Sequence, residues 1–272
     1  MAAVCALAAC SGGLSHRSLV EMSGDVPIGP EIRRVRLEIQ DGTVGVDRQE
    51  ARAVHFGGGM RRAADTAEGL VAIEAIPVEP KASVDPADAS TLVLRGPHLS
   101  ENGPNGVLAY EMGLKLPADL ELEVVIVRNG GVTVVNRDAP LKVTTGRGDL
   151  RFERCKGGTK AFTGRGVVIA VDMEQRVDIE SAVGDMQVFV TGPGDLLRLR
   201  TGQGTIQCFI PPATGFVCSA RAEVGFAGSG FGLEKEKTAQ MGMAMTGTRG
   251  DGRTKIVLTT GSGYLHLEKH VK

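Results

Sequence analysis

Hydrophobic and polar residues alternate along most of the chain after residue 115, in short stretches separated by glycine-rich turns. Each stretch places two hydrophobic residues two positions apart, as in Leu150 and Phe152 or Leu197 and Leu199. Side chains at positions i and i+2 lie on one face of a β-strand, so this alternation predicts short strands with one buried face. The glycines between the stretches predict tight corners.

The corner glycines recur at nearly constant spacing. The six anchor positions are Gly130, Gly148, Gly166, Gly184, Gly204 and Gly263. The first three steps are 18 residues long, the next is 20, and the last is 59, about three units with a longer excursion at residues 228–252. A unit this short buries its hydrophobic face only by stacking on its neighbours. The spacing therefore predicts an all-β, single-stranded β-solenoid with units of 18 to 20 residues.

A hydroxyl residue stands three positions before most of these glycines. The positions are Thr145, Thr163, Ser181, Thr201 and Thr260. Neighbouring strands lie about 4.8 Å apart. Stacked at that distance, the five hydroxyls are expected to form a hydrogen-bonded ladder along the corner.

These units resemble a known family. The recurring T-G-x-G-Φ-x-Φ pattern (Φ, hydrophobic), the segment LPADLELEV at 116–124 and the closing GSGYLHLEK resemble bacterial adhesin-like β-solenoid domains of unknown function. That family is related to proposed auto-transporter adhesin head domains and is described as a right-handed β-helix. The resemblance covers roughly residues 33–270 and implies a right-handed β-helix-like fold. It transfers no catalytic residues, because the family has no established chemistry.

The region at 31–115 is less regular and is expected to form an irregular N-terminal cap. Residues 34–47 alternate around Asp41-Gly42 and predict a first unit or a hairpin. A short helix is expected within residues 60–76, a loop at 77–89 and a strand at 91–94. Regular units then occupy residues 116–272, within one solenoid domain at 31–272.

The chain begins with a run of small apolar residues that ends in Leu7-Ala8-Ala9-Cys10. This ending resembles a bacterial lipobox. Cys10 would then be diacylated, residues 1–10 would be a signal remnant and residues 11–30 a flexible tether. The run lacks the basic region of a lipoprotein signal, which a start codon placed too late would explain. The alternative is an ordinary apolar N-terminus. Beyond this run, no apolar stretch approaches the roughly 18 residues that span a bilayer.

Composition narrows the classes of partner. The formal net charge is −1, Trp is absent and Tyr occurs twice. A neutral chain produces no long-range field that gathers nucleic acid, and the few aromatic residues offer no series of base-stacking platforms. We therefore expect no nucleic-acid partner.

Candidate chemical motifs are few. Arg-Gly-Asp occurs at 147–149, where it coincides with a glycine corner, and at 249–251 in a glycine-rich loop; both are weak adhesion signals. No phosphate-binding loop is complete, and the five histidines are too scattered to predict a metal site. Cys208 and Cys218 are expected to pack as free thiols, with a disulfide between them as the alternative. No cofactor is predicted.

Outward positions of the regular strands carry charges of mixed sign, as in Lys142, Asp178 and Arg198. This favours a non-enzymatic binding or scaffold module, anchored through Cys10 in the membrane of the bacterial cell envelope. Its partner would be an envelope protein or a surface glycan, contacted by one sheet face or by residues 228–252. The alternatives are an enzyme acting on envelope polysaccharide, which needs clustered carboxylates, and an envelope-stress sensor.

Overall fold

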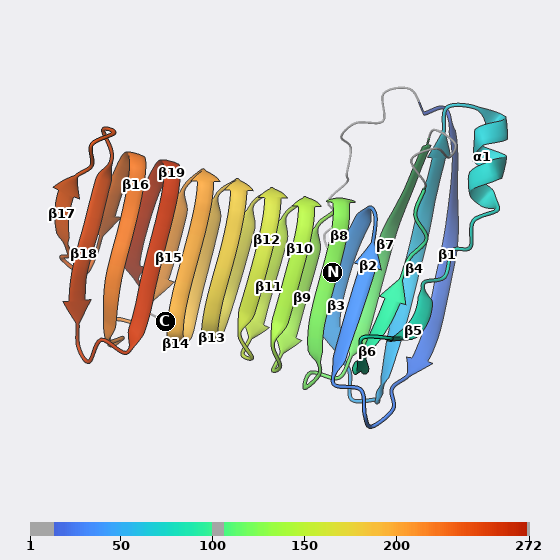
Figure 1. Ribbon diagram of the computed structural model, residues 1–272, viewed down its shortest axis with the longest axis horizontal. Coiled ribbons are helices and arrows are strands. Elements are labelled where there is room, and N and C mark those ends of the chain that lie inside the picture. Colours follow the sequence, from blue (N-terminus) through green and yellow to red (C-terminus); the bar gives the residue numbers. More distant parts are fainter. Residues whose placement is uncertain (1–13, 100–105, 271–272) are drawn as a thin grey trace.

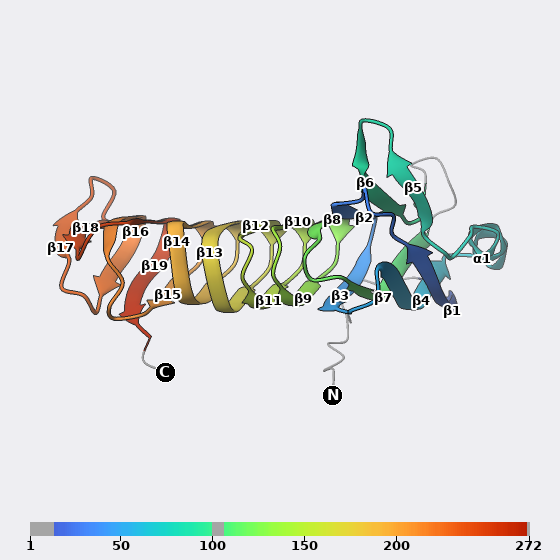
Figure 2. The same cartoon turned by 90° about the horizontal axis from the view of Figure 1, so that it is seen from below.

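The computed structural model describes residues 14–99 and 106–270 and shows an all-β protein with one short helix (Figure 1). Nineteen strands are hydrogen-bonded in one continuous sheet. The sheet folds back on itself into two layers with a single hydrophobic core between them (Figure 2). We call these the front layer, which faces the viewer in Figure 1, and the back layer.

The front layer starts at the N-terminal end of the molecule with strands that pair mostly with segments distant in sequence. In order it contains β5 (Lys81–Asp85), β6 (Asp88–Arg95), β2 (Arg34–Ile39), β8 (Glu121–Asn129), β10 (Leu141–Arg147), β12 (Thr159–Arg165), the second halves of β13 (Val168–Val183) and β14 (Met186–Gln203), the first halves of β19 (Thr254–Lys269) and β16 (Phe216–Ser229), then β18 (Met243–Arg249) and β17 (Glu234–Lys237).

The back layer runs beside it. In order it contains β1 (His16–Pro27), β4 (Ala53–Ala64), β7 (Gly106–Leu116), β3 (Gly42–Arg48), β9 (Val132–Arg137), β11 (Leu150–Cys155), the first halves of β13 and β14, β15 (Ile206–Ile210), and the last residues of β19 and β16. Strands β13, β14, β16 and β19 are long enough to belong to both layers.

The expectation of a regular β-solenoid is wrong. The sheet is mixed: its central pairs are parallel, but antiparallel pairs form both ends, namely β1–β4, β4–β7 and β5–β6 at one end and β16–β18 and β17–β18 at the other. The glycine spacing reports only the parallel pairs of the middle, which join residues 18 to 20 apart. It carries no information about strands that pair as hairpins.

The N-terminal third also differs from the expectations. Residues 16–27, assigned to a flexible tether, form β1 and pair along their whole length with β4. Residues 34–47 form a first unit, one of the two expected alternatives, because β2 and β3 pair in parallel with β8 and β9 of the next unit. They do not form a hairpin with each other. Part of the expected loop at 77–89 is strand β5. The short helix expected within residues 60–76 is confirmed.

That helix is α1 (Ala67–Glu74), and it begins where the sequence supplies a cap. The hydroxyl of Thr66 accepts a hydrogen bond from the amide of Gly69, 3.0 Å away, and satisfies one of the free amides of the first turn. Ile73 is its one fully buried side chain. Residues 60–64, at the start of the segment within which the helix was expected, belong to β4 because their β-strand partners in β7 and β1 outweigh local helix propensity.

The core is filled by complementary side chains from the two layers. Phe152 of β11 is fully buried, and its register partner on the adjacent strand β13 is the small residue Ala170. Ala161 of β12 is a small buried residue of the front layer. Alternating large and small residues in this way lets neighbouring strands share one densely packed interior. Thr159, beside Ala161, is buried without a hydrogen-bond partner among the described residues.

Candidate functional site

The corner glycines lie in one stack at the edge where the chain passes between the two layers. Five of them have positive φ, from +143° at Gly204 to +159° at Gly166. A Cβ on any of the six predicted glycines would overlap the carbonyl oxygen of another glycine in the stack. Gly42 and Gly225 extend the stack at its two ends. The sequence pattern marked Gly42 as a turn but missed Gly225, because no regular unit surrounds it.

The hydroxyl residues beside these glycines contact the backbone. Thr145, Thr163, Thr201 and Thr260 each donate a hydrogen bond to a carbonyl of the glycine stack, at 2.9 to 3.0 Å. The expected ladder therefore joins each hydroxyl to a glycine carbonyl rather than to the next hydroxyl. Ser181 is the exception, because its buried hydroxyl has no partner among the described residues.

The two Arg-Gly-Asp segments occupy local structural positions. Asp149 accepts a hydrogen bond from the amide of Val167, 2.8 Å away, in the next corner. Asp185 makes the same contact with Thr205 at 2.7 Å, so this carboxylate belongs to the corner. In the second segment the carboxylate of Asp251 pairs with Arg253 at 2.8 Å.

Cys208 and Cys218 are buried free thiols, as is Cys155. Burial raises the pKa of Cys218 to about 12 and raises the pKa of Cys208 further. Thiols held in the neutral form are poor nucleophiles, so both pack as small hydrophobic residues.

The lipid-attachment residue predicted from the sequence, Cys10, lies outside the described residues. Within residues 14–99 and 106–270, no group of three or more His, Cys, Asp or Glu side chains is arranged to hold a metal ion. The same residues contain no helix with the length and hydrophobicity required to cross a bilayer.

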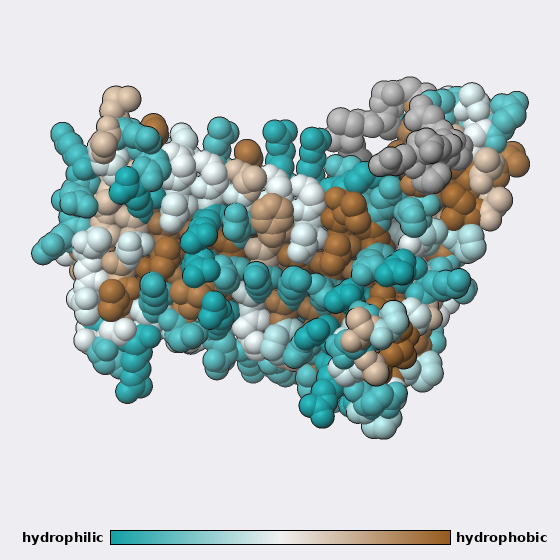
Figure 3. All heavy atoms as spheres, in the orientation of Figure 1, coloured by the Kyte–Doolittle hydropathy of each residue, from teal (hydrophilic) through white to brown (hydrophobic). Residues whose placement is uncertain are grey.

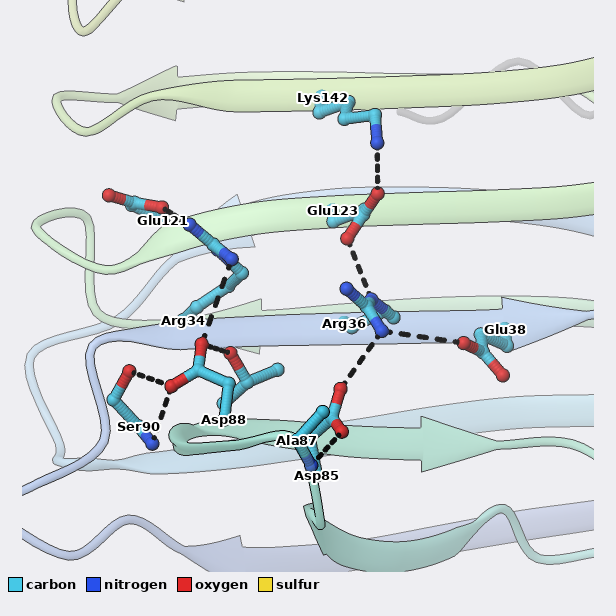
Figure 4. A network of polar contacts seen from close by, with 11 residues as sticks. Arg34, Arg36, Glu38, Asp85, Ala87, Asp88, Ser90, Glu121, Glu123 and Lys142 are labelled. Atoms are coloured by element: carbon cyan, nitrogen blue, oxygen red, sulfur yellow. Dashed lines mark hydrogen bonds and ion pairs between the residues drawn. The ribbon is translucent and has the colours of Figure 1, made fainter.

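A network of ion pairs crosses the outer surface of the front layer at its N-terminal end (Figure 4). Arg36 of β2 donates to Glu123 of β8 at 2.7 Å and to Asp85 of β5 at 3.1 Å. Glu123 also accepts from the ammonium group of Lys142 on β10, 2.6 Å away. Beside this chain of contacts, Arg34 binds Glu121 at 2.6 Å. Four strands are thus connected by charged side chains.

The network stabilises the charged forms of its members. Burial by itself raises the pKa of Glu123, but hydrogen bonds from Lys142 and Arg36 outweigh this and leave the pKa below its ordinary value. The hydrogen bond to Glu123 likewise raises the pKa of Arg36. Nearby, hydrogen bonds from Ser90 and Thr91 lower the pKa of Asp88 to about 2. A general acid needs a raised carboxyl pKa, and these groups have the opposite shift.

A shallow depression of about 190 Å³ continues the same surface over β10, β12 and β13. Six outward side chains surround it in two rows: Lys142, Lys160 and Asp178 in one, and Thr144, Phe162 and Glu180 in the other. Adjacent members of a row are register partners on neighbouring parallel strands. In Figure 3 this face alternates between hydrophilic and hydrophobic patches.

Some charged side chains around the depression form ion pairs within the protein, and others do not. Lys142 pairs with Glu123, and Asp178 pairs with Arg198 at 3.2 Å. Lys160 and Glu180 have no ion pair with any described residue, and the ring of Phe162 is 39% exposed. The depression therefore presents an unpaired cation, an unpaired anion and an aromatic ring on a rigid sheet.

Sequence reasoning placed Lys142, Asp178 and Arg198 on a mixed charged face but did not single out Lys160 or Phe162. The signal was present, because Phe162 is an aromatic residue at an outward position whose counterparts are Thr144 and Glu180. The Arg36 network had no comparable signal. Its contact with Glu123 joins residues 87 positions apart.

A second hollow of about 460 Å³ lies between β1 and β4 and is lined by Glu21, Met22, Ser23, Gly57 and Gly58. Its floor is low because glycines contribute no side chains. It contains no aromatic residue and no cation, so it offers little chemistry for recognition.

No family model matches the chain, and no curated protein matches it. Among solved structures, a Clostridium sporogenes ATCC 15579 protein with a proposed cell-adhesion role is 11% identical, with a TM-score of 0.36 over 92% of this chain and 100% of that chain. A proposed adhesin from Bacteroides fragilis NCTC 9343 is also 11% identical, with a TM-score of 0.38 over 93% and 97%. Likeness at this level establishes neither a family nor a function.

Proposed function

We propose that this chain is a non-enzymatic, adhesin-like binding or scaffold module whose contact surface is the outer face of β10, β12 and β13. One observation carries the proposal: Lys160, Phe162 and Glu180 stand together on the depression without an ion pair to a described residue, whereas Lys142 and Asp178 beside them are paired. Exposed aromatic and charged groups on a rigid support contribute to recognition because little conformational entropy is lost on binding. The sequence resemblance to adhesin-like domains agrees with this role.

An enzyme acting on polysaccharide is the second candidate, and one observation favours it. Glu123 and Asp85 both contact Arg36, so two carboxylates do approach each other, contrary to the expectation of scattered charges. Arg36 lies between them, however, and the pKa of Glu123 is lowered. Paired carboxylates of a glycosidase need one group that stays protonated near neutral pH. The arrangement therefore suits a structural network better than catalysis.

We further propose that the module is attached to the bacterial cell envelope through a lipid on Cys10. One diacylated N-terminal cysteine supplies two acyl chains, enough for stable membrane anchoring. Mass spectrometry of the native N-terminus after membrane fractionation tests this directly. A diacyl-cysteine in the membrane fraction is expected, and an unmodified Met1 in the soluble fraction would exclude the anchor.

Binding to envelope material tests the contact surface. A triple variant, Lys160→Glu, Phe162→Ala and Glu180→Lys, is expected to lose at least tenfold in co-sedimentation with envelope fractions of the producing organism. The matched control makes the same three chemical changes elsewhere, also at charged residues without an ion pair to a described residue: Lys115→Glu, Phe226→Ala and Glu21→Lys. Circular dichroism must show that both triple variants remain folded. Equal loss in the two variants, or no loss in either, would refute this surface as the contact site.

A further inference from the structure

The side chains of the depression that lack an ion pair indicate the chemical class of ligand that would fit it. Lys160 faces Lys142 as a register partner on the adjacent strand, about 4.8 Å away along the sheet. Like charges placed directly opposite each other destabilise a sheet. Lys142 is neutralised on its other side by Glu123. The register partner of Lys160 on its other side, Asp178, pairs with Arg198, and Lys160 itself makes no ion pair with a described residue. An anionic group bound between the two lysines would remove this repulsion.

The second row adds an apolar platform and a hydrogen-bond acceptor. Phe162 lies between the small side chain of Thr144 and the carboxylate of Glu180. A carboxylate accepts hydrogen bonds and donates none when ionised. The complementary ligand therefore carries an anion at one side, a flat apolar face over the ring, and hydroxyl donors at the other side.

A carboxylated sugar combines these three features in one ring. Its carboxylate matches the lysines, the C–H face of the ring matches Phe162, and its hydroxyls match Glu180. An acidic peptide supplies the anion, but its side chains bring no hydroxyl to Glu180 and no rigid apolar face to Phe162. The size agrees as well, because about 190 Å³ corresponds to roughly six water molecules, on the order of one sugar ring.

We propose that the depression formed by Lys142, Lys160, Phe162 and Glu180 binds one uronic-acid unit of an acidic glycan. This inference rests on the proposed binding function and names its ligand class. The lysines hold the carboxylate, Phe162 covers the apolar face of the ring, and Glu180 accepts from its hydroxyls.

The test measures binding of the full chain to a glucuronic-acid-containing hexasaccharide, using calorimetry and amide chemical shifts. The probes for comparison are the same oligosaccharide with its carboxyl groups reduced to alcohols, and hexaglutamate. The expected result is chemical-shift changes confined to β10, β12 and β13, with at least tenfold weaker binding of the carboxyl-reduced probe. Hexaglutamate is expected to bind at least tenfold more weakly too.

Variants assign the contributions. Lys160→Gln and Phe162→Ala are each expected to weaken binding about threefold to tenfold, in line with a solvent-exposed charge contact and one aromatic contact. Phe226→Ala is the matched control, because Phe226 is also 39% exposed and lies beneath a lysine, Lys235, 5.1 Å from its ring. This control and Lys115→Gln, on the back layer, should bind as the unmodified chain does.

Three results would overturn the inference: no binding of the acidic hexasaccharide, equal binding of the reduced probe, or equal binding of hexaglutamate, which would identify an acidic peptide instead. Equal weakening by Phe226→Ala would also do so, since it would place the contact elsewhere. If the front-face triple variant loses envelope binding while the hexasaccharide does not bind, the glycan assignment fails and the proposed binding function stands.

Discussion

The chain passes between the two layers at both edges of the sheet, but it turns there with different backbone conformations. At the glycine edge, the chain passes between layers through residues with φ of +143° to +159°, a region in which L side chains are strained. At the opposite edge, Asn136, Arg154 and Asp172 have φ of +53° to +57°. That left-handed conformation costs a side chain roughly 1–2 kcal/mol but is accessible to it. The first edge prescribes its residue type, and the second does not.

The two edges also differ in how their residues pack. A Cβ at the glycine edge would collide with the backbone of the neighbouring corner, which cannot move without separating the strands. The opposite edge is looser in sequence but contains the fully buried Arg137, which donates to the carbonyls of Leu116, Pro117 and Leu120. One edge is therefore defined by missing side chains and the other by a single large one.

Gly204→Ala should give the largest effect. The substitution combines a strained φ of +143° with overlap of the Gly184 carbonyl. We expect a loss of about 3–5 kcal/mol in the free energy of unfolding, measured by urea denaturation. Gln175→Gly at the opposite edge, where φ is +60°, should change the same quantity by less than about 1 kcal/mol. Similar losses at both sites would remove the distinction between the edges.

Arg137→Met tests the position at the opposite edge where one large buried side chain holds several backbone carbonyls. Methionine preserves much of the volume but removes the guanidinium donor from three backbone carbonyls. The carbonyls of Leu116 and Pro117 still accept from the amides of Gln49 and Leu120. Burial lowers the pKa of Arg137 to about 10, so removing the buried charge recovers part of its desolvation cost. Because an unpaired buried acceptor costs about 1–3 kcal/mol, and the Leu120 carbonyl is the one that loses its donor, we expect a net loss of about 1–3 kcal/mol in thermal or urea unfolding. An unchanged or raised stability would show that the carbonyls find other partners.

The contrast between the edges also explains what could be predicted from the sequence. Gly148 and its equivalents were found because no other residue fits their corner, and the strands beside them follow from alternation. Asn136, Arg154 and Asp172 are also 18 residues apart, but three different residue types leave no visible pattern. The antiparallel ends were missed for the same reason: β1 pairs with β4 through residues such as Leu19 and Arg61, whose identities do not specify a partner.

The candidate site was predictable only in part. Charges on the outer face follow from strand alternation, whereas the pairing of Arg36 with Glu123 depends on β2 lying beside β8, which no local pattern encodes. Lys160 and Phe162 occupy outward positions of the same alternation but were not singled out from the sequence. Their significance required knowing that Lys142 and Asp178 on either side are already paired.

The smallest predicted effect is a difference in stability between variants of two hydroxyl residues at the glycine edge, Thr163 and Ser181. Thr163 donates to the carbonyl of Gly148 at 3.0 Å, so Thr163→Val removes a buried hydrogen bond and should cost about 1 kcal/mol in the free energy of unfolding. Ser181 occupies the equivalent position without a partner among the described residues. Ser181→Ala removes an unsatisfied buried hydroxyl and should be neutral or stabilising by up to about 1 kcal/mol. If the two variants lose the same stability, the hydroxyls act through packing alone, and the glycine edge owes its rigidity to its backbone contacts.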